Sequence, residues 1–155
     1  MKNKNLFLST AFIVIVFLCS ITSCRKESHV FSKELESKIE RIEVDKVFSL
    51  DTIQGGEWTH FCIITPYMDP DSLITTNNIK CKEADLSELK TLTMLDNINT
   101  LLILRADMLK KVEILSRSVI DFSDIAQTDL GIFSSNQTFI INKNRSARIC
   151  EDSNH

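Results

Sequence analysis

Hydrophobic residues alternate with polar ones in several short stretches of this chain, which is the pattern of β-strands. The clearest example is EWTHFCIITPY, residues 57–67. The segment 100–117 has two apolar runs and predicts a hairpin, and its first strand is expected to be central because both faces of Leu101–Leu104 are apolar. Two further strands are predicted in VDKVFSLDTI, residues 44–53, and in QTFIINKN, residues 137–144.

Helical spacing of apolar residues is clearest near the start of the domain. Residues 31–42 place four apolar side chains on one face, with Ser32 as a candidate N-cap. Asp69 and Pro70 fit the N-cap and the first position of a short second helix. In residues 85–89 an Asp-x-x-Glu spacing is a candidate capping box for one further turn of helix, with loop around it.

These elements predict one α+β domain over residues 31–150. We expect an antiparallel sheet of four or five strands, with an N-terminal helix and one or two short helices packed on one face and loops on the other. The polar residues from Ala147 onward are predicted to form a tail, of which 151–155 lie beyond the domain. With only 3 Gly and 2 Pro, the chain does not have the composition of a linker.

The first 24 residues follow a different pattern, in which two lysines precede an apolar run from Leu6 to Ile21. This order of charged, apolar and small residues is typical of a secretory signal, and the run is short for a transmembrane helix. Its end, Ile-Thr-Ser-Cys at 21–24, resembles the lipobox of bacterial lipoproteins. The resemblance implies that residues 1–23 are removed as a signal peptide and that Cys24 carries acyl chains that hold the protein on a membrane.

The residues after the lipobox bear on which membrane holds the protein. Residues 24–30 form a short tether, which has neither the Asp of an inner-membrane retention signal nor the acidic run of a surface-export signal. We therefore expect the outer membrane, with the domain facing the periplasm. Removing the two lysines of the leader lowers the basic count from 18 to 16, against 21 acidic residues, for a formal charge of −5. This charge argues against a nucleic-acid partner and against a polybasic membrane-binding face.

Three cysteines remain in the domain, so at most one disulfide can form among them. Cys81 with Cys150 is the candidate pair, because Cys62 lies in a predicted core strand and the other two lie in polar surroundings. Three reduced thiols are the alternative. The cysteines lack the paired spacing of a zinc site, and we expect no metal or cofactor.

His60 and Cys62 are the candidates for nucleophilic catalysis, because both side chains leave the same face of one strand. Side chains two residues apart on a strand are separated by about 6.5–7 Å, which is too far for a direct hydrogen bond. A buried Cys beside a hydrogen-bonded His is the simpler interpretation. A small hydrolase would need a third polar group nearby and a depressed Cys pKa.

Four segments, EWTHFCIITPY at 57–67, TLLILRADMLKKVEIL at 100–115, RSVIDFSDI at 117–125 and QTFIIN at 137–142, carry a further resemblance. Together they resemble a family of small secreted or lipid-anchored bacterial proteins of unknown function. In that family a tryptophan strand ends in Pro-Tyr, a hairpin follows, and an Arg precedes an Asp-Phe pair before a final strand. Trp58, Pro66–Tyr67, Arg117 and Asp121–Phe122 occupy these places here, whereas the glycine common before Pro-Tyr is Thr65. The resemblance supports the fold and implies no particular function.

Four residues are candidates for a binding surface. Trp58 and Tyr67 bracket the strand in residues 57–67 and form a candidate aromatic platform, although a lone Trp on such a strand is more often core. Arg117 and Asp121 are a candidate polar pair at a groove, with a structural salt bridge as the alternative.

Two tripeptides, Asp-Thr-Ile at 51–53 and Asp-Ser-Leu at 71–73, resemble an O-glycosylation acceptor of one group of envelope-rich bacteria. They make Thr52 and Ser72 candidate acceptors, of which Ser72 is the better one. As a whole, the sequence predicts a lipid-anchored envelope protein with a non-catalytic binding or accessory role, whose partner is another envelope protein. The alternatives are an immunity-type lipoprotein that neutralises a toxin delivered to the periplasm, and a small hydrolase that uses the His-Cys pair.

Overall fold

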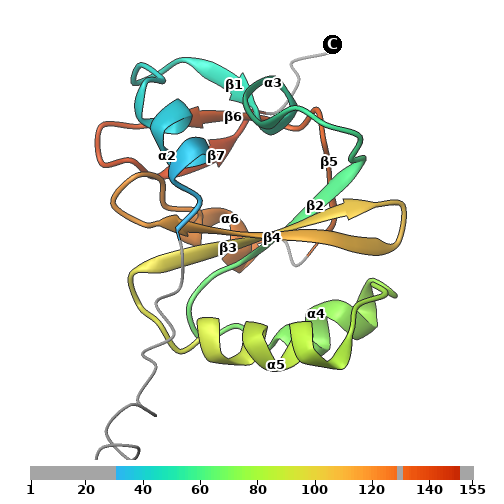
Figure 1. Cartoon of the computed structure of the whole chain (residues 1–155). Coiled ribbons are helices and arrows are strands. Elements are labelled where there is room, and N and C mark those ends of the chain that lie inside the picture. Colours follow the sequence, from blue (N-terminus) through green and yellow to red (C-terminus); the bar gives the residue numbers. More distant parts are fainter. Residues whose placement is uncertain (1–30, 129–130, 151–155) are drawn as a thin grey trace, which may run out of the picture.

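The computed structural model describes residues 31–128 and 131–150 and shows an α+β fold, which confirms the predicted class (Figure 1). Its elements in chain order are α2 (Lys33–Glu40), β1 (Val47–Ser49), α3 (Leu50–Gln54), β2 (His60–Ile64), α4 (Pro70–Thr76), α5 (Glu83–Leu92), β3 (Ile98–Arg105), β4 (Met108–Ser116), α6 (Ser123–Thr128), β5 (Phe133–Ser134), β6 (Thr138–Ile141) and β7 (Ala147–Ile149). Within these two ranges, every helix is too short or too polar to cross a membrane.

Four antiparallel strands form the larger sheet, in the order β4-β3-β2-β5. β3 lies between β4 and β2 and is buried from Ile98 to Leu104, so the prediction of a central strand is confirmed. The predicted hairpin is β3–β4, and its turn passes through Ala106 at a φ of 53°, a conformation that glycine adopts more easily. The hairpin therefore places a buried strand beside β4, which lies at the edge of the sheet.

A second sheet has three strands in the order β1-β6-β7, and the sequence did not predict it. Of the strand predicted over 44–53, only Val47–Ser49 forms one, because a turn precedes it and the chain continues after it into the short helix α3. Leu50 and Ile53 are three residues apart in this helix, and both pack into the core. One helical turn was therefore mistaken for the end of a strand.

The prediction of a tail from Ala147 onward is also wrong. Residues 147–149 form β7, which pairs with β6 and places Ile149 opposite Phe139. A strand of three residues is too short for its alternation to be recognised in the sequence. The predicted tail at 151–155 lies outside the described residues.

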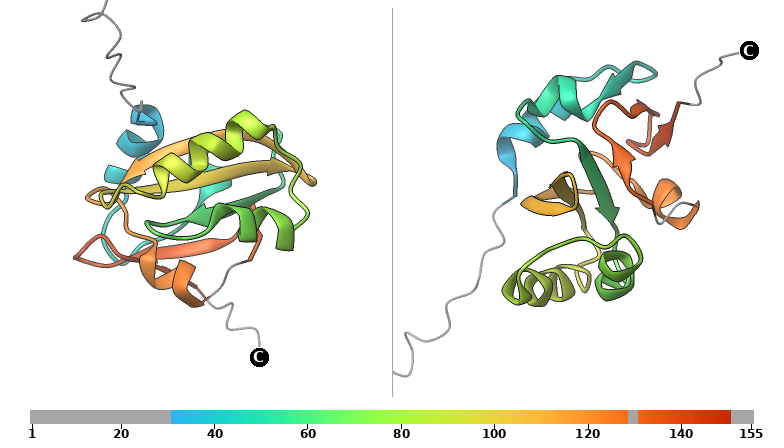
Figure 2. Two further views of the ribbon diagram at one scale, coloured as in Figure 1. Left: turned by 90° about the horizontal axis from the view of Figure 1, so that it is seen from below. Right: turned by 90° about the vertical axis from the view of Figure 1, so that its right-hand side faces the viewer.

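Two hydrophobic clusters lie on opposite faces of the larger sheet (Figure 2). One lies under α4 and α5 and includes Cys62 of β2 and Leu89 of α5. The other is centred on Phe61, Phe122 and Phe139 and also contains buried residues of α2 and α6. The second face is therefore covered by α2, α6 and the smaller sheet, and not by loops as predicted.

The helix starts agree with the sequence in part. Asp69 caps α4 as predicted, because its carboxylate accepts hydrogen bonds from the N–H groups of Asp71 and Ser72. Helix α5 is longer than predicted: Asp85 is its third residue and accepts a hydrogen bond from the Lys82 N–H at 3.1 Å. Asp85 therefore lies inside the first turn of α5 and is not the N-cap of a later one.

Candidate functional site

The four residues predicted as a binding surface do not form one platform. Trp58 lies just before β2, at the end of the strand opposite to Tyr67, and packs against the core with its ring edge-on to Phe61 at a centroid separation of 6.0 Å. Its indole N–H donates to the Gly55 carbonyl oxygen at 3.0 Å. These contacts assign Trp58 to the fold and separate it from Tyr67.

Tyr67 occupies a turn position that favours glycine. The Met68 N–H donates to the Thr65 carbonyl oxygen at 3.3 Å, which closes a turn with Pro66 second and Tyr67 third. Tyr67 has a φ of 65° at this third position, as in a type II turn, although its side chain is 73% exposed. A non-glycine residue in this conformation costs about 1–2 kcal/mol. Its N–H also donates to the Thr93 carbonyl oxygen at 2.8 Å, which fixes the turn to the end of α5.

Three of the four predicted residues are joined through Asp96, which the sequence analysis did not identify. The Tyr67 hydroxyl donates to the Asp96 carboxylate, and the Arg117 guanidinium donates to the Asp96 carbonyl oxygen at 2.9 Å. Arg117 also binds both carboxylate oxygens of Asp121, at 3.1 and 2.7 Å. The salt bridge given as the alternative is therefore present, and it supports the segment that holds Tyr67.

The charges in this chain of contacts stabilise one another. The hydrogen bond to Asp96, followed by the charge of that carboxylate, raises the pKa of Tyr67. The hydrogen bond with Asp121 raises the pKa of Arg117. Burial alone would raise the pKa of Asp121, but hydrogen bonds from Arg117 and Ser123 outweigh it and lower that pKa below its ordinary value. Arg117 and Asp121 therefore stay ionised at neutral pH.

Two shallow hollows lie beside Tyr67. One has a volume of about 370 Å³, and its lining includes Tyr67 and Met94, two large apolar side chains that are 73% and 72% exposed. The second, of about 180 Å³, shares Met68 with the first and runs along α4. We call the apolar part of this region the Tyr67 surface; its members are Tyr67, Met68, Pro70, Thr93 and Met94.

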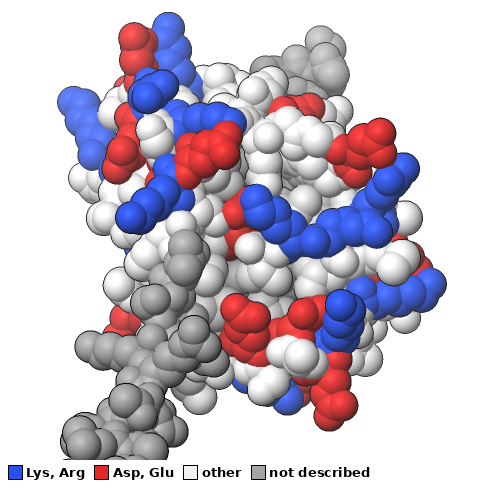
Figure 3. Space-filling view, in the orientation of Figure 1, with Lys and Arg blue, Asp and Glu red and all other residues white. Residues whose placement is uncertain are grey.

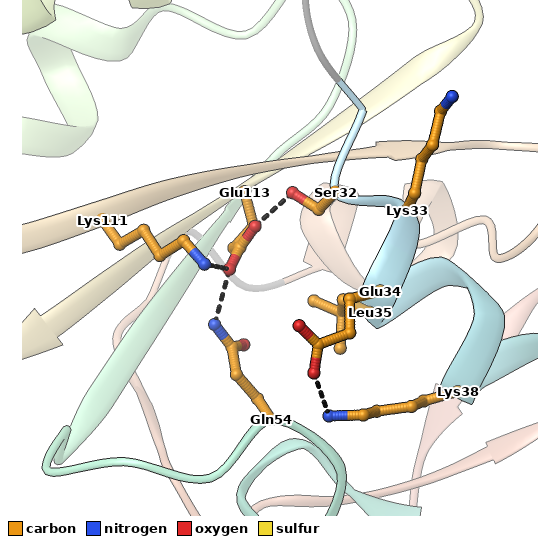
Figure 4. A pocket seen from close by; sticks show the side chains of 8 residues that line it. All are labelled: Ser32, Lys33, Glu34, Leu35, Lys38, Gln54, Lys111 and Glu113. Carbon is orange, nitrogen blue, oxygen red and sulfur yellow. Dashed lines mark hydrogen bonds and ion pairs between the residues drawn. The ribbon is translucent and has the colours of Figure 1, made fainter.

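A pocket of about 200 Å³ lies elsewhere, between α2, α3 and β4 (Figure 4). Its main feature is Glu113, which is only 3% exposed. The Glu113 carboxylate accepts hydrogen bonds from the Ser32 hydroxyl and from the Gln54 amide at 2.7 Å, and it forms an ion pair with Lys111. We call these four residues the Glu113 junction.

The Glu113 junction fastens the start of α2 to the edge of the larger sheet. The Ser32 N–H donates to the Ile114 carbonyl oxygen at 2.9 Å, and the Ile114 N–H donates to the Ser32 hydroxyl at 3.1 Å. Ser32 stands at the N-cap position as predicted, but its side chain bonds to β4 and does not cap the helix. The buried Gln54 Oε1 has no hydrogen-bond partner among the described residues. These contacts join segments that are distant in the sequence, so we interpret the pocket as part of the packing between α2, α3 and β4 and not as a binding site.

His60 and Cys62 do not form a catalytic pair. Cys62 is fully buried, and burial raises the pKa of its thiol to about 12, which is the opposite of what a thiolate nucleophile needs. His60 is partly exposed, and its Nδ1 lies 2.9 Å from the hydroxyl of the neighbouring Thr59. The simpler interpretation, a buried cysteine beside a hydrogen-bonded histidine, agrees with these contacts.

The candidate disulfide is not formed. Cys62, Cys81 and Cys150 are all free thiols in the structure. Cys81 follows Lys80, which pairs with Met108 at the start of β4, whereas Cys150 follows β7 in the smaller sheet. The two cysteines therefore lie beside different sheets, and their polar surroundings in the sequence could not show this. In the described part of the chain, no cluster of His, Cys, Asp and Glu has the arrangement of a metal site.

The candidate modification sites differ in what the structure says of them. Thr52 in α3 and Ser72 in α4 are both exposed, and Ser72 lines the second hollow beside the Tyr67 surface. Glycosylation at either residue stays a prediction. Cys24, the predicted lipid attachment site, lies outside the described residues.

No known protein family, curated protein or solved structure matches this chain. The resemblances to lipoproteins and to the uncharacterised secreted family therefore stay predictions from the sequence.

Proposed function

We propose that this protein is a lipid-anchored cell-envelope protein, attached through Cys24 to the periplasmic face of the outer membrane, and that it acts as a non-catalytic binding module. Its binding site is the Tyr67 surface, and its partner is another envelope protein. The leader with its lipobox-like end supports the anchor.

The observation that carries the binding role is the conformation of Tyr67. Its backbone adopts a strained φ of 65°, while its ring gains almost no burial in return, since 73% of the residue is exposed. Strain of this kind persists where the surroundings fix it, and it is concentrated at functional sites. The hydrogen bonds to Thr93 and Asp96 hold the ring in one place, which lowers the entropy that a partner must remove on binding.

The surface has the chemistry of a protein contact. Tyr and Met are enriched in protein interfaces, and Met94 beside Tyr67 provides a second exposed apolar side chain. The face shown in Figure 3 carries both acidic and basic side chains. The buried, protonated Cys62 gives no support to the hydrolase alternative.

The test is chemical crosslinking in native envelopes, followed by affinity capture and mass spectrometry, with the wild-type chain and two glycine variants. Tyr67→Gly removes the ring at a position where glycine fits the backbone. Asn78→Gly is the matched control, because Asn78 is exposed, has a φ of 51° and lies outside the Tyr67 surface. We expect one partner to be enriched with wild type and with N78G and to be lost with Y67G.

Equal enrichment with Y67G would show that the Tyr67 surface is not the binding site. If the captured partner is a toxin that is delivered to the periplasm, the result would favour the alternative of an immunity-type lipoprotein. Attachment is tested separately, by the intact mass of the mature protein and by its release from membranes in a Cys24→Ala variant. An intact mass that lacks acyl chains would contradict the anchor.

A further inference from the structure

We infer that the partner of the Tyr67 surface is a protein held in the same membrane as the lipid anchor, with an apolar recess surrounded by basic groups. The inference rests on the proposed function and names the class of partner. It follows from the position of the surface relative to the tether, and from the size and charge of the surface.

The tether keeps the start of the domain close to the membrane. Seven residue steps separate Cys24 from Phe31, which span at most about 25 Å when fully extended. Directly after the tether the chain is attached to β4, because the Ser32 N–H donates to the Ile114 carbonyl oxygen. The Glu36 carboxylate also accepts a hydrogen bond from the Ser116 N–H at 2.6 Å. The end of β4 is therefore held within a short distance of the anchoring membrane.

The Tyr67 surface lies at this same end of the larger sheet. Arg117 follows β4 directly and is three residues from Ile114, or about 10 Å along an extended chain. The Arg117 guanidinium reaches Asp96, whose carboxylate holds the Tyr67 hydroxyl. In Figure 1 the end of α5, which precedes Met94, and the start of α2 both lie on the left-hand side of the molecule. The surface therefore belongs to the half of the domain that the tether keeps near the membrane.

The charges around the surface favour a protein over the lipid itself. In and beside its lining, Asp69, Asp71 and Asp96 are acidic, and Lys90 and Arg117 are basic. Both cations form ion pairs, Lys90 with Asp71 and Arg117 with Asp121, each at 2.7 Å. An acidic rim is repelled by anionic head groups, which attract basic segments instead. The same rim is complementary to a partner with basic groups around an apolar recess.

The small size of the surface gives the anchor a role in binding. Two exposed apolar side chains beside a hollow of about 370 Å³ make the core of a small contact, and transient contacts bury less than about 1,200 Å². A tether that holds two weak binders on one membrane confines both to a thin layer, which raises their effective concentration above that in free solution. Binding to a partner in the same membrane is therefore favourable where binding to a dilute soluble protein is not.

The experiment places a photoreactive residue at position 94 of the full-length protein in native envelopes, as Met94→p-benzoylphenylalanine, so that Tyr67 is kept. Val47 is the control position, because it is 60% exposed and lies on β1 of the smaller sheet. Three forms are compared: the natural tether, a tether lengthened about fourfold with Gly and Ser before Phe31, and Cys24→Ala. Adding Tyr67→Gly to the first form tests dependence on the ring.

We expect position 94, but not position 47, to crosslink one integral or lipid-anchored protein in a Tyr67-dependent way. The fourfold longer tether should lower the yield, because it lets the domain move through a larger volume above the membrane, and Cys24→Ala should abolish the crosslink. A soluble partner with equal yields in all three forms would overturn the inference and leave the proposed function standing. Crosslinks to lipid alone would overturn the inference, and the absence of any Tyr67-dependent protein crosslink in all forms would overturn both.

Discussion

The Glu113 junction and the Tyr67 surface both depart from the ordinary rule that polar groups are exposed and apolar groups are buried. The junction buries a carboxylate, and the surface exposes a tyrosine and a methionine. The two regions differ in the contacts that offset the energetic cost of these exceptions. Glu113 has partners from α3, β4 and the residue before α2. Tyr67, in contrast, donates its hydroxyl to Asp96 and stays 73% exposed.

The difference separates residues that serve the fold from residues that serve something outside it. A buried carboxylate with three hydrogen-bond donors fixes where α2 and the tether join the sheet, so its presence is explained within the domain. An exposed aromatic residue at a glycine position has no such explanation, because glycine would relieve the backbone strain. A substitution in the Glu113 junction should therefore lower the stability of the domain. A substitution of Tyr67 should weaken binding without lowering stability.

The largest expected effect is on the stability of the Glu113 junction. Glu113→Ala leaves Ser32 and Gln54 without their acceptor, and it should lower the free energy of unfolding by about 2–4 kcal/mol. The exposed Lys111 adds little to this figure, because surface ion pairs are weak. Chemical denaturation of the unlipidated domain measures the effect.

Glu34→Ala is the control for this experiment. Glu34 lines the same pocket, but its side chain is 86% exposed and forms a surface ion pair with Lys38. We expect its denaturation curve to overlay that of the wild type. A Glu113→Ala variant as stable as E34A would mean that the junction does not hold α2 to the sheet.

The second prediction concerns substitution of Tyr67, which should change the free energy of unfolding by less than Glu113→Ala does and in the opposite direction. Tyr67→Gly should leave the free energy of unfolding unchanged or raise it by up to about 1 kcal/mol, because glycine adopts the positive φ without strain. Asn78→Gly should behave similarly, since it has a comparable φ. Thermal and chemical unfolding of both variants provide the measurement. A clear loss of stability in Y67G alone would show that the ring serves the fold, and it would remove the main argument for a binding site there.

The sequence predicted the parts of this molecule that depend on local patterns. The central strand, the hairpin and the Asp69 cap follow from apolar runs and from cap chemistry within a few residues. The smaller sheet was not predicted, because β1 and β7 have only three residues each and are defined by their pairing with β6. For β1 this partner strand is far away in the sequence. Local periodicity carries no information about such pairing.

The candidate site was predicted in part for the same reason. Arg117 and Asp121 were predicted as a pair and Tyr67 separately from them, and their connection through Asp96 depends on a fold that brings three loops together. The signal that was available is the Thr-Pro-Tyr-Met turn, because Pro second in a turn leaves a third position that favours glycine. Glu113 gave a weaker signal, as a single acid between the apolar residues Val112 and Ile114.

The smallest predicted effect is the acid dependence contributed by Asp121, which supports the Tyr67 surface through Arg117. The pKa of Asp121 in the folded protein lies below its ordinary value of 3.8, so between the two values the unfolded chain binds more protons than the folded one. The stability from this contact is therefore complete above about pH 4 and is lost as the pH falls through the lower value. Asp121→Asn should be less stable than wild type at pH 7, and the two stability curves should converge in acid. Glu57→Gln is the control, because Glu57 is 82% exposed and its ion pair with Arg105 lies at the surface. Parallel curves for D121N and wild type down to about pH 2 would contradict the shift and would leave Arg117 without a role in holding Asp96 and Tyr67 in place.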